Sequence, residues 1–177
     1  MRKINSIVTI ILILLFLDHG IFGTLNTLGK AKVFLPVAYL LRVFLVIHVI
    51  ISIILTVRSE KVSFKTKAPY NKENREYWLR RWTGVLIFVF FIAHMRMAKG
   101  GVDGTAKLAN TSTFGKISFI LFMASIAAHL AINFRPLMIS LGVKNHKVIT
   151  RVLNIIYIAI CLIAAIACIY TMIGGGK

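Results

Sequence analysis

The chain has 177 residues, 58% of which are hydrophobic, and its 22 Lys and Arg against 5 Asp and Glu give a net charge of +17. Apolar runs of about 18 residues or more exclude an ordinary soluble domain, because such a run spans the ~30 Å hydrocarbon core of a bilayer. In a soluble chain this charge would favour a nucleic-acid partner, but here the basic residues lie between apolar runs. We therefore predict an integral membrane protein that contacts lipid and no nucleic acid.

Five apolar segments follow in order, and we predict an all-α bundle of five transmembrane helices that forms a single domain, residues 1–177. The predicted helices are about 4–25, 33–57, 78–98, 116–139 and 149–173. Pro36 falls in the first turn of the second helix, where its missing N–H costs little. The longest polar stretch, Arg58–Tyr77, is predicted to connect the second helix with the third. The first segment resembles a signal peptide, but without a small-x-small cleavage site we interpret it as a mature helix.

The distribution of Lys and Arg over the predicted connections sets the orientation of the bundle. The side that holds the N-terminus has fourteen basic residues, namely Arg2, Lys3, Arg58, Lys61, Lys65, Lys67, Lys72, Arg75, Arg80, Arg81, Arg135, Lys144, Lys147 and Arg151. The opposite side has seven, namely Lys30, Lys32, Arg96, Lys99, Lys107, Lys116 and Lys177. By the positive-inside rule, we predict a cytoplasmic N-terminus, an outside C-terminus and a multi-pass location in the cytoplasmic (inner) membrane.

The two cysteines, Cys161 and Cys168, lie seven residues apart in the last apolar run. Two cysteines so placed on one helix do not easily form a disulfide, and they lack the pattern of a metal site. We interpret both as small packing residues.

Four of the predicted helices each contain one histidine: His19, His48, His94 and His129. An ionisable side chain in such a segment is costly and by default indicates function. With ~1.5 Å of rise per residue, His19 and His94 lie about 9 and 6 Å from the outer end, and His48 and His129 about 22 and 20 Å. The four therefore form an outer pair and an inner pair. Each pair can bind one haem iron from opposite faces, an arrangement suited to electron transfer.

Other interpretations of these histidines remain open. A single histidine in a helix bundle is more often a polar residue whose hydrogen bonds a neighbouring helix satisfies. A proton-relay transporter would also use histidines, but acidic partners would then be expected within the helices, and only Asp18 qualifies. We interpret His146, in the predicted inner turn, as a surface residue.

The order of these features resembles the five-helix, di-haem cytochrome b subunit of succinate:quinone oxidoreductases, which include succinate dehydrogenases and fumarate reductases. The resemblance covers essentially the whole chain. Its most specific part is an Arg-x-Thr-Gly motif with a histidine ten residues after the glycine. The residues that carry the resemblance are His19, His48, Arg81, Thr83, Gly84, His94, His129 and Asn133.

This resemblance implies two haems b, an outer one held by His19 and His94 and an inner one held by His48 and His129. It also implies a flavoprotein subunit and an iron–sulfur subunit on the cytoplasmic face, and a membrane quinone, usually menaquinone, as the other electron partner. The chain has no flavin or iron–sulfur motif, so by itself it is not expected to oxidise succinate. It departs from the family in its first helix, which begins almost at residue 1, so the usual polar N-terminal segment is nearly absent.

Basic side chains are expected near the anionic haem propionates, because a guanidinium pairs a carboxylate through two hydrogen bonds. The first candidates are Arg42 and Arg81, and Arg96, Arg80 and Arg135 are the second choice. Membrane anchoring explains Arg80, Arg81 and Arg135 equally well. Arg42 lies about 14 Å deep, too far to reach the interface easily, so it needs a partner within the bundle. Thr83 and Gly84 are small residues where a porphyrin or a helix could approach closely.

Asp18 is the only acidic residue within a predicted helix. One hypothesis is that it exchanges protons when quinone reacts near the outer haem, and the alternative is a salt bridge to Arg42. Two other functions also remain open for the chain. One is a di-haem cytochrome b with another partner, as in hydrogenases or formate dehydrogenases, although those families arrange their histidines differently along the helices. The other is a haem-free proton-coupled transporter or an assembly protein. The haem content distinguishes the cytochromes from the others.

Overall fold

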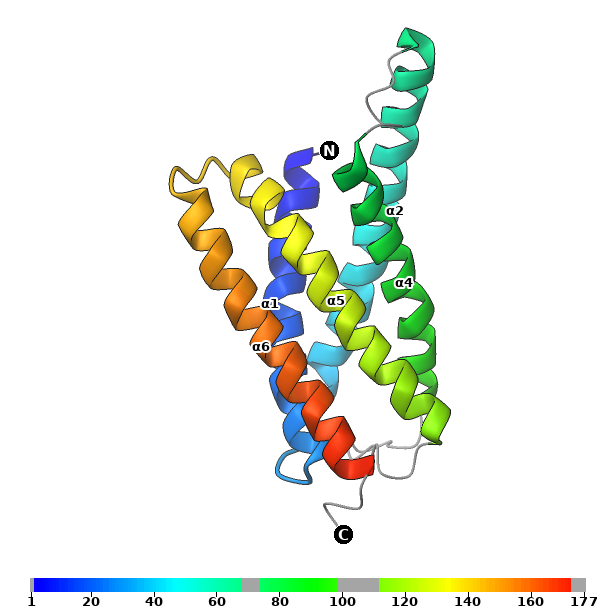
Figure 1. Ribbon diagram of the computed structural model, residues 1–177, viewed down its shortest axis with the longest axis vertical. Coiled ribbons are helices and arrows are strands. Elements are labelled where there is room, and N and C mark those ends of the chain that lie inside the picture. The colour runs from blue at the N-terminus through cyan, green and yellow to red at the C-terminus, as the bar shows by residue number, and fades with distance from the viewer. Residues whose placement is uncertain (1, 68–73, 99–111, 173–177) are drawn as a thin grey trace.

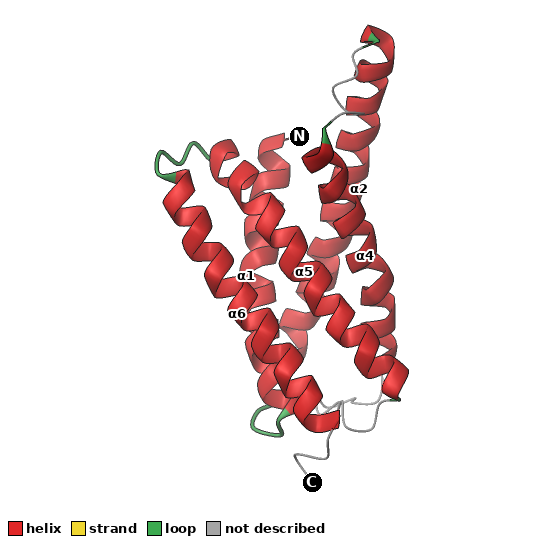
Figure 2. Ribbon diagram, in the orientation of Figure 1, coloured by secondary structure: helices red, strands yellow, loops and turns green. Residues whose placement is uncertain are grey.

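The computed structural model describes residues 2–67, 74–98 and 112–172 (Figure 1). Over these ranges the regular structure consists of helices and includes no strand (Figure 2). The helices are α1 (Arg2–Thr27), α2 (Leu35–Thr66), α4 (Arg75–Ala98), α5 (Thr113–Ser140) and α6 (His146–Met172). Each of the five contains a stretch long and apolar enough to cross a membrane. The prediction of an all-helical chain with five such segments is therefore confirmed.

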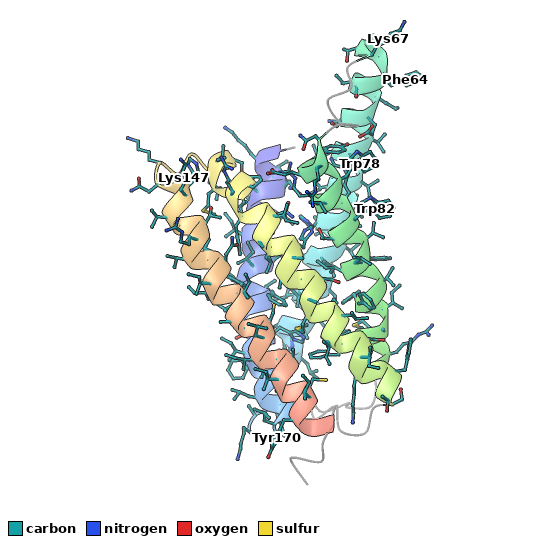
Figure 3. All side chains as sticks on the ribbon, in the orientation of Figure 1. Phe64, Lys67, Trp78, Trp82, Lys147 and Tyr170 are labelled. Carbon is teal, nitrogen blue, oxygen red and sulfur yellow. The ribbon has the colours of Figure 1, made fainter. Side chains whose placement is uncertain are left out.

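The predicted boundary of the second helix is wrong, because α2 continues nine residues beyond Val57 and ends at Thr66. The segment after Val57 is polar but contains neither Gly nor Pro before Pro69, so nothing in it breaks a helix. In Figure 1 this end of α2 reaches beyond the rest of the bundle, and Phe64 and Lys67 lie at its tip (Figure 3). Hydropathy therefore indicated where the apolar part of the helix ends and not where the helix itself ends.

Successive helices run in opposite directions, so the N-terminus and the α5–α6 turn lie at the same end of the bundle (Figure 1). Two of the turns depend on glycine, because Gly29 and Gly142 have φ values of +70° and +74°, which residues with a Cβ rarely adopt. At the start of α5 the Ser112 hydroxyl caps the helix by accepting a hydrogen bond from the Gly115 N–H. His19 lies on α1 and His94 on α4, whereas His48 lies on α2 and His129 on α5.

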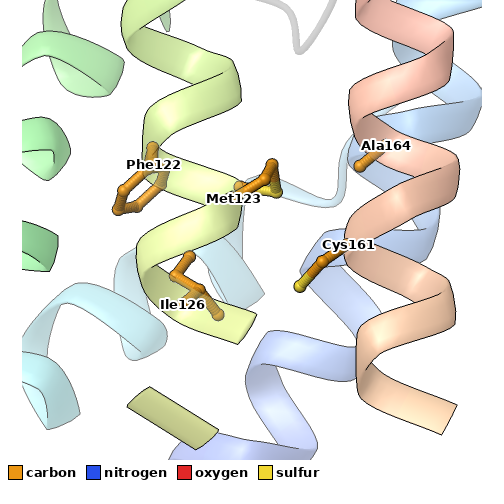
Figure 4. Packing of buried hydrophobic residues seen from close by; sticks show 5 residues of the cluster. All are labelled: Phe122, Met123, Ile126, Cys161 and Ala164. Atoms are coloured by element: carbon orange, nitrogen blue, oxygen red, sulfur yellow. The ribbon is translucent and has the colours of Figure 1, made fainter. Parts of the chain in front are cut away.

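The buried core lies between α5 and α6, with α1 against both. One cluster joins Phe122, Met123 and Ile126 of α5 with Cys161 and Ala164 of α6. In Figure 4 Met123 points toward α6, whereas the Phe122 ring points away from it. Both cysteines are buried, and Cys168 is 0% exposed. The interpretation of the cysteines as packing residues is therefore confirmed.

Large apolar side chains are exposed on all five helices, for example Leu14, Ile53, Val89, Leu121 and Ile166. An apolar surface this extensive is typical of a protein surrounded by lipid. Trp78 and Trp82 lie near the end that holds the N-terminus, and Tyr170 lies near the other end (Figure 3). Such aromatic residues are enriched at the two interfaces of a membrane. These features suit a multi-pass membrane protein.

Phe134 is the largest fully buried side chain and is 1% exposed. Its ring centre lies 5.3 Å from that of Tyr157 on α6. We expect Phe134→Ala to lower the free energy of unfolding in detergent by about 3 kcal/mol, because it leaves a cavity between tightly packed helices. The matched control is Phe114→Ala on the same helix, where Phe114 is 78% exposed. Thermal unfolding curves that move equally for both variants would contradict this prediction.

Candidate functional site

His19 of α1 and His94 of α4 lie side by side, with ring centres 6.1 Å apart and ring planes at 84°. The His94 ring also stacks on Phe122 of α5, with centres 5.4 Å apart. Nδ1 of His19 is buried and has no hydrogen-bond partner in the part of the chain that the structure describes. The structure therefore brings together the two histidines that the sequence assigns to the outer pair, and one of their nitrogens lacks a protein partner.

His48 of α2 and His129 of α5 are the other predicted pair. Nδ1 of His129 lies 2.9 Å from Oγ1 of Thr83 on α4, and a Cβ placed on Gly84 would lie 3.5 Å from Cε1 of the same ring. Nδ1 of His48 lies 3.3 Å from Oγ1 of Thr9 on α1. Thr83 and Gly84, which were predicted to permit close approach, therefore contact the histidine of the neighbouring helix.

The separation of the outer rings fits two ligands on opposite sides of one metal ion. An imidazole nitrogen lies about 2 Å from a metal that it binds and the ring centre about 1 Å further back, so two such rings have centres about 6 Å apart. The observed distance between the His19 and His94 ring centres is 6.1 Å. A buried ring nitrogen without a protein partner, as at Nδ1 of His19, is also typical of a site that receives a further group.

Each histidine pair offers two nitrogens, so a metal bound there needs ligands from outside the protein. No group of three or more His, Cys, Asp or Glu side chains within the described ranges is arranged to hold a metal ion. A porphyrin provides its own ring nitrogens and leaves two axial positions for the protein. The donor sets of both pairs therefore fit a haem better than a bare metal ion.

Each histidine pair also joins two helices that are not close neighbours. Close packing joins α5 with α4 and α6, and α1 with α2 and α6, while α1 touches α5 less extensively. Among the described residues, α1 with α4 and α2 with α5 are not close-packed pairs. Since closely packed helices lie with their axes only about 8–10 Å apart, a planar cofactor needs a wider pair. The arrangement is compatible with haem binding at both levels.

The structure divides the four candidate arginines into two groups. Arg42 lies close enough to His19 and His94 for their charges to interact, and its Cζ is 4.9 Å from the Tyr39 ring centre. Arg81 lies two residues before Thr83 and is half-buried, so it is near the inner pair. Arg96 and Arg135 are exposed, which favours an anchoring role for both. Binding of haem propionates remains a prediction for all four.

Asp18 is half-buried and lies close enough to His19 for their charges to interact. No ion pair joins Asp18 to Arg42 within the ranges that the structure describes. The salt bridge suggested by the sequence is therefore not formed. Asp18 and Arg42 instead both lie near the outer histidine pair.

Sequence reasoning missed a polar cluster between the C-terminal part of α2 and the N-terminal part of α4. The Tyr77 hydroxyl donates a hydrogen bond to the Glu60 carboxylate. Cζ of Arg81 lies 3.1 Å from the centre of the Tyr77 ring. Nη1 of Arg81 donates a hydrogen bond of 2.8 Å to the Tyr77 carbonyl oxygen. The buried Nε of Arg81 has no hydrogen-bond partner among the described residues. Glu60 and Tyr77 were assigned to a loop, so their approach to Arg81 was not expected.

Thr9 was also missed as a residue of the inner site. A signal was available, because Thr9 lies near the same predicted depth as His48, on the helix that precedes it in the chain. Which of the residues at that depth face each other depends on the rotation of each helix about its axis, and the packing decides this rotation.

No known protein family, curated protein or solved structure matches the chain. The residues and their geometry are therefore the basis for the function that follows.

Proposed function

We propose that the chain is the di-haem cytochrome b membrane-anchor subunit of a succinate:quinone oxidoreductase. In this role it anchors a flavoprotein and an iron–sulfur subunit and carries electrons between the iron–sulfur subunit and membrane menaquinone. The observation that carries the proposal is the arrangement of four histidines on four apolar helices as two separate pairs, one of them with ring centres 6.1 Å apart.

The residues have distinct tasks in this proposal. His19 and His94 bind the iron of the outer haem, and His48 and His129 bind that of the inner haem. When bound, each haem supplies reversible one-electron chemistry, and two axial histidines leave no open position for oxygen. Arg42 near the outer pair and Arg81 near the inner pair provide positive charge for propionates.

The proposed orientation places the end with the N-terminus and the α5–α6 turn in the cytoplasm. The fourteen basic residues predicted on that side support it by the positive-inside rule. The iron–sulfur partner would dock at this end, where the basic extension of α2 projects (Figure 1). The protein would lie in the cytoplasmic membrane.

Haem content tests the proposal directly. We expect the purified protein to give about two haems b per polypeptide in a pyridine haemochrome assay, because each proposed histidine pair would hold one haem. His146→Ala is the matched control, since His146 begins α6 and belongs to neither pair, and it should keep the full haem content. A helical, detergent-soluble protein that binds no haem would overturn the proposal.

A proton role for Asp18 gives a second expectation. We expect Asp18→Asn to slow quinone turnover by the assembled complex at least about 10-fold, because a positioned carboxylate speeds proton transfer, while haem spectra stay normal. Glu76→Gln, in the first turn of α4, serves as the control and should leave turnover unchanged. Full quinone turnover in Asp18→Asn would exclude the proton role.

A further inference from the structure

Two threonines contact the inner histidine pair in the same way. Thr9 of α1 lies against His48 of α2, and Thr83 of α4 lies against His129 of α5. In both contacts Oγ1 faces the Nδ1 atom of the imidazole, at 3.3 Å and 2.9 Å respectively. Each histidine of the inner pair therefore has a threonine Oγ1 next to its Nδ1 atom.

The threonine hydroxyl has one proton, and in both residues it is already used. Thr9 donates to the Asn5 carbonyl and Thr83 to the Leu79 carbonyl, each at 2.7 Å and each one helical turn back. A carbonyl oxygen accepts and cannot donate, so the proton lies on the hydroxyl in both bonds. The remaining lone pairs of Oγ1 can only accept, and they face the histidine.

This leaves one tautomer for both histidines. If Oγ1 accepts, Nδ1 of His48 and of His129 carries the hydrogen and donates it. In a neutral imidazole the other nitrogen, Nε2, then has a free lone pair, which is the form that binds a metal. The threonines thus select the tautomer that an axial ligand needs.

The fold holds each contact rigidly. Both contacts cross closely packed helix pairs, α1 with α2 and α4 with α5, whereas the two histidines themselves belong to α2 and α5, which are not closely packed. Threonine is branched at Cβ, so its χ1 angle is restricted and the hydroxyl direction is well defined. The His48 ring is therefore positioned by α1, and the His129 ring by α4.

The outer pair lacks this arrangement. Nδ1 of His19 is buried without a hydrogen-bond partner among the described residues, and His94 instead stacks on Phe122. Threonines elsewhere make the same bond one turn back without contacting a histidine, namely Thr24 to the Gly20 carbonyl and Thr56 to the Ser52 carbonyl, both at 2.7 Å. The histidine contact is therefore not a general consequence of a threonine within a helix.

We propose that Thr9 and Thr83 are positioning residues for the inner haem, which fix the tautomer and ring orientation of His48 and His129. The proposal rests on the proposed function, because it assumes that these histidines bind iron. A hydrogen bond from Nδ1–H makes the imidazole a more basic ligand and so favours the ferric state. The threonines should therefore lower the midpoint potential of the inner haem and leave that of the outer haem unchanged.

The test compares Thr9→Val and Thr83→Val, which replace a hydroxyl with a methyl group of similar size, in the purified holoprotein. Redox titrations and electron paramagnetic resonance spectra of the oxidised protein follow the two haems separately. We expect both variants to move the potential and low-spin signal of one haem only, with the potential more positive. Transfer of that haem to apomyoglobin should become about 10-fold faster or more. The controls are Thr24→Val and Thr56→Val, which should change neither haem, and Thr83→Ser, which should restore the parent values.

Three results would overturn the inference. Potentials in Thr9→Val and Thr83→Val that equal those of the control variants would show that the hydroxyls do not act on the ligands. Equal shifts in Thr83→Ser and Thr83→Val would assign the effect to packing of the methyl group. A parent protein without haem would overturn the proposed function as well, whereas a parent with both haems and unshifted variants would overturn this inference alone.

Discussion

Replacement of His94 with alanine is expected to remove one haem from the protein and to leave the other in place. In the proposed function His94 and His19 would hold the same iron, and their ring centres lie 6.1 Å apart. Loss of either axial ligand leaves the iron with a single protein bond, so the haem content should fall from about two to about one per polypeptide. The pyridine haemochrome assay measures this directly.

Combinations of histidine variants test the pairing itself. If His19 and His94 hold the same haem, as proposed, His19→Ala with His94→Ala should lose no more haem than either change alone, a strongly non-additive result. His94→Ala with His129→Ala should remove both haems, since it breaks one ligand of each pair. If instead His19→Ala with His94→Ala removed both haems and His94→Ala with His129→Ala removed one, the assignment of histidines to pairs would be wrong.

Gly84→Val is expected to abolish binding of the inner haem. A Cβ at position 84 would lie 3.5 Å from Cε1 and 3.9 Å from Nδ1 of His129, which is ordinary contact, so Gly84→Ala should be tolerated. The two methyl groups of valine extend about one bond further and would meet the imidazole ring. They would push it away from the iron, so about one haem per polypeptide should be lost, and the remaining haem should be the outer one.

Gly23→Val is the matched control for this prediction. Gly23 also lies within a helix. Apart from its two chain neighbours and the nearby backbone of its own helix, a Cβ at this position would have no atom within 4 Å. Both variants carry the same cost of valine in a helix, so a difference between them reports the histidine contact. Full haem content in Gly84→Val would mean that His129 moves freely or does not bind haem.

Much of the framework follows from the sequence because hydropathy and helical rise are local properties. Runs of apolar residues located the five helices, and ~1.5 Å of rise per residue placed His19 level with His94, and His48 level with His129. In the structure the ring centres of His19 and His94 lie 6.1 Å apart. The end of α2 was misplaced because the segment after Val57 is polar and nevertheless helical, and hydropathy does not measure helix propensity.

Only the tertiary structure decided which side chains meet across helices. Depth alone did not indicate that Thr9 faces His48, that Gly84 faces the His129 ring, or that Tyr77 and Glu60 gather beside Arg81. These contacts depend on the rotation of each helix about its axis and on which helices become neighbours. Both are set by side-chain packing over the whole bundle, chiefly between α5 and its neighbours α4 and α6. The sequence by itself therefore determined the histidine levels, and packing determined the residues that surround them.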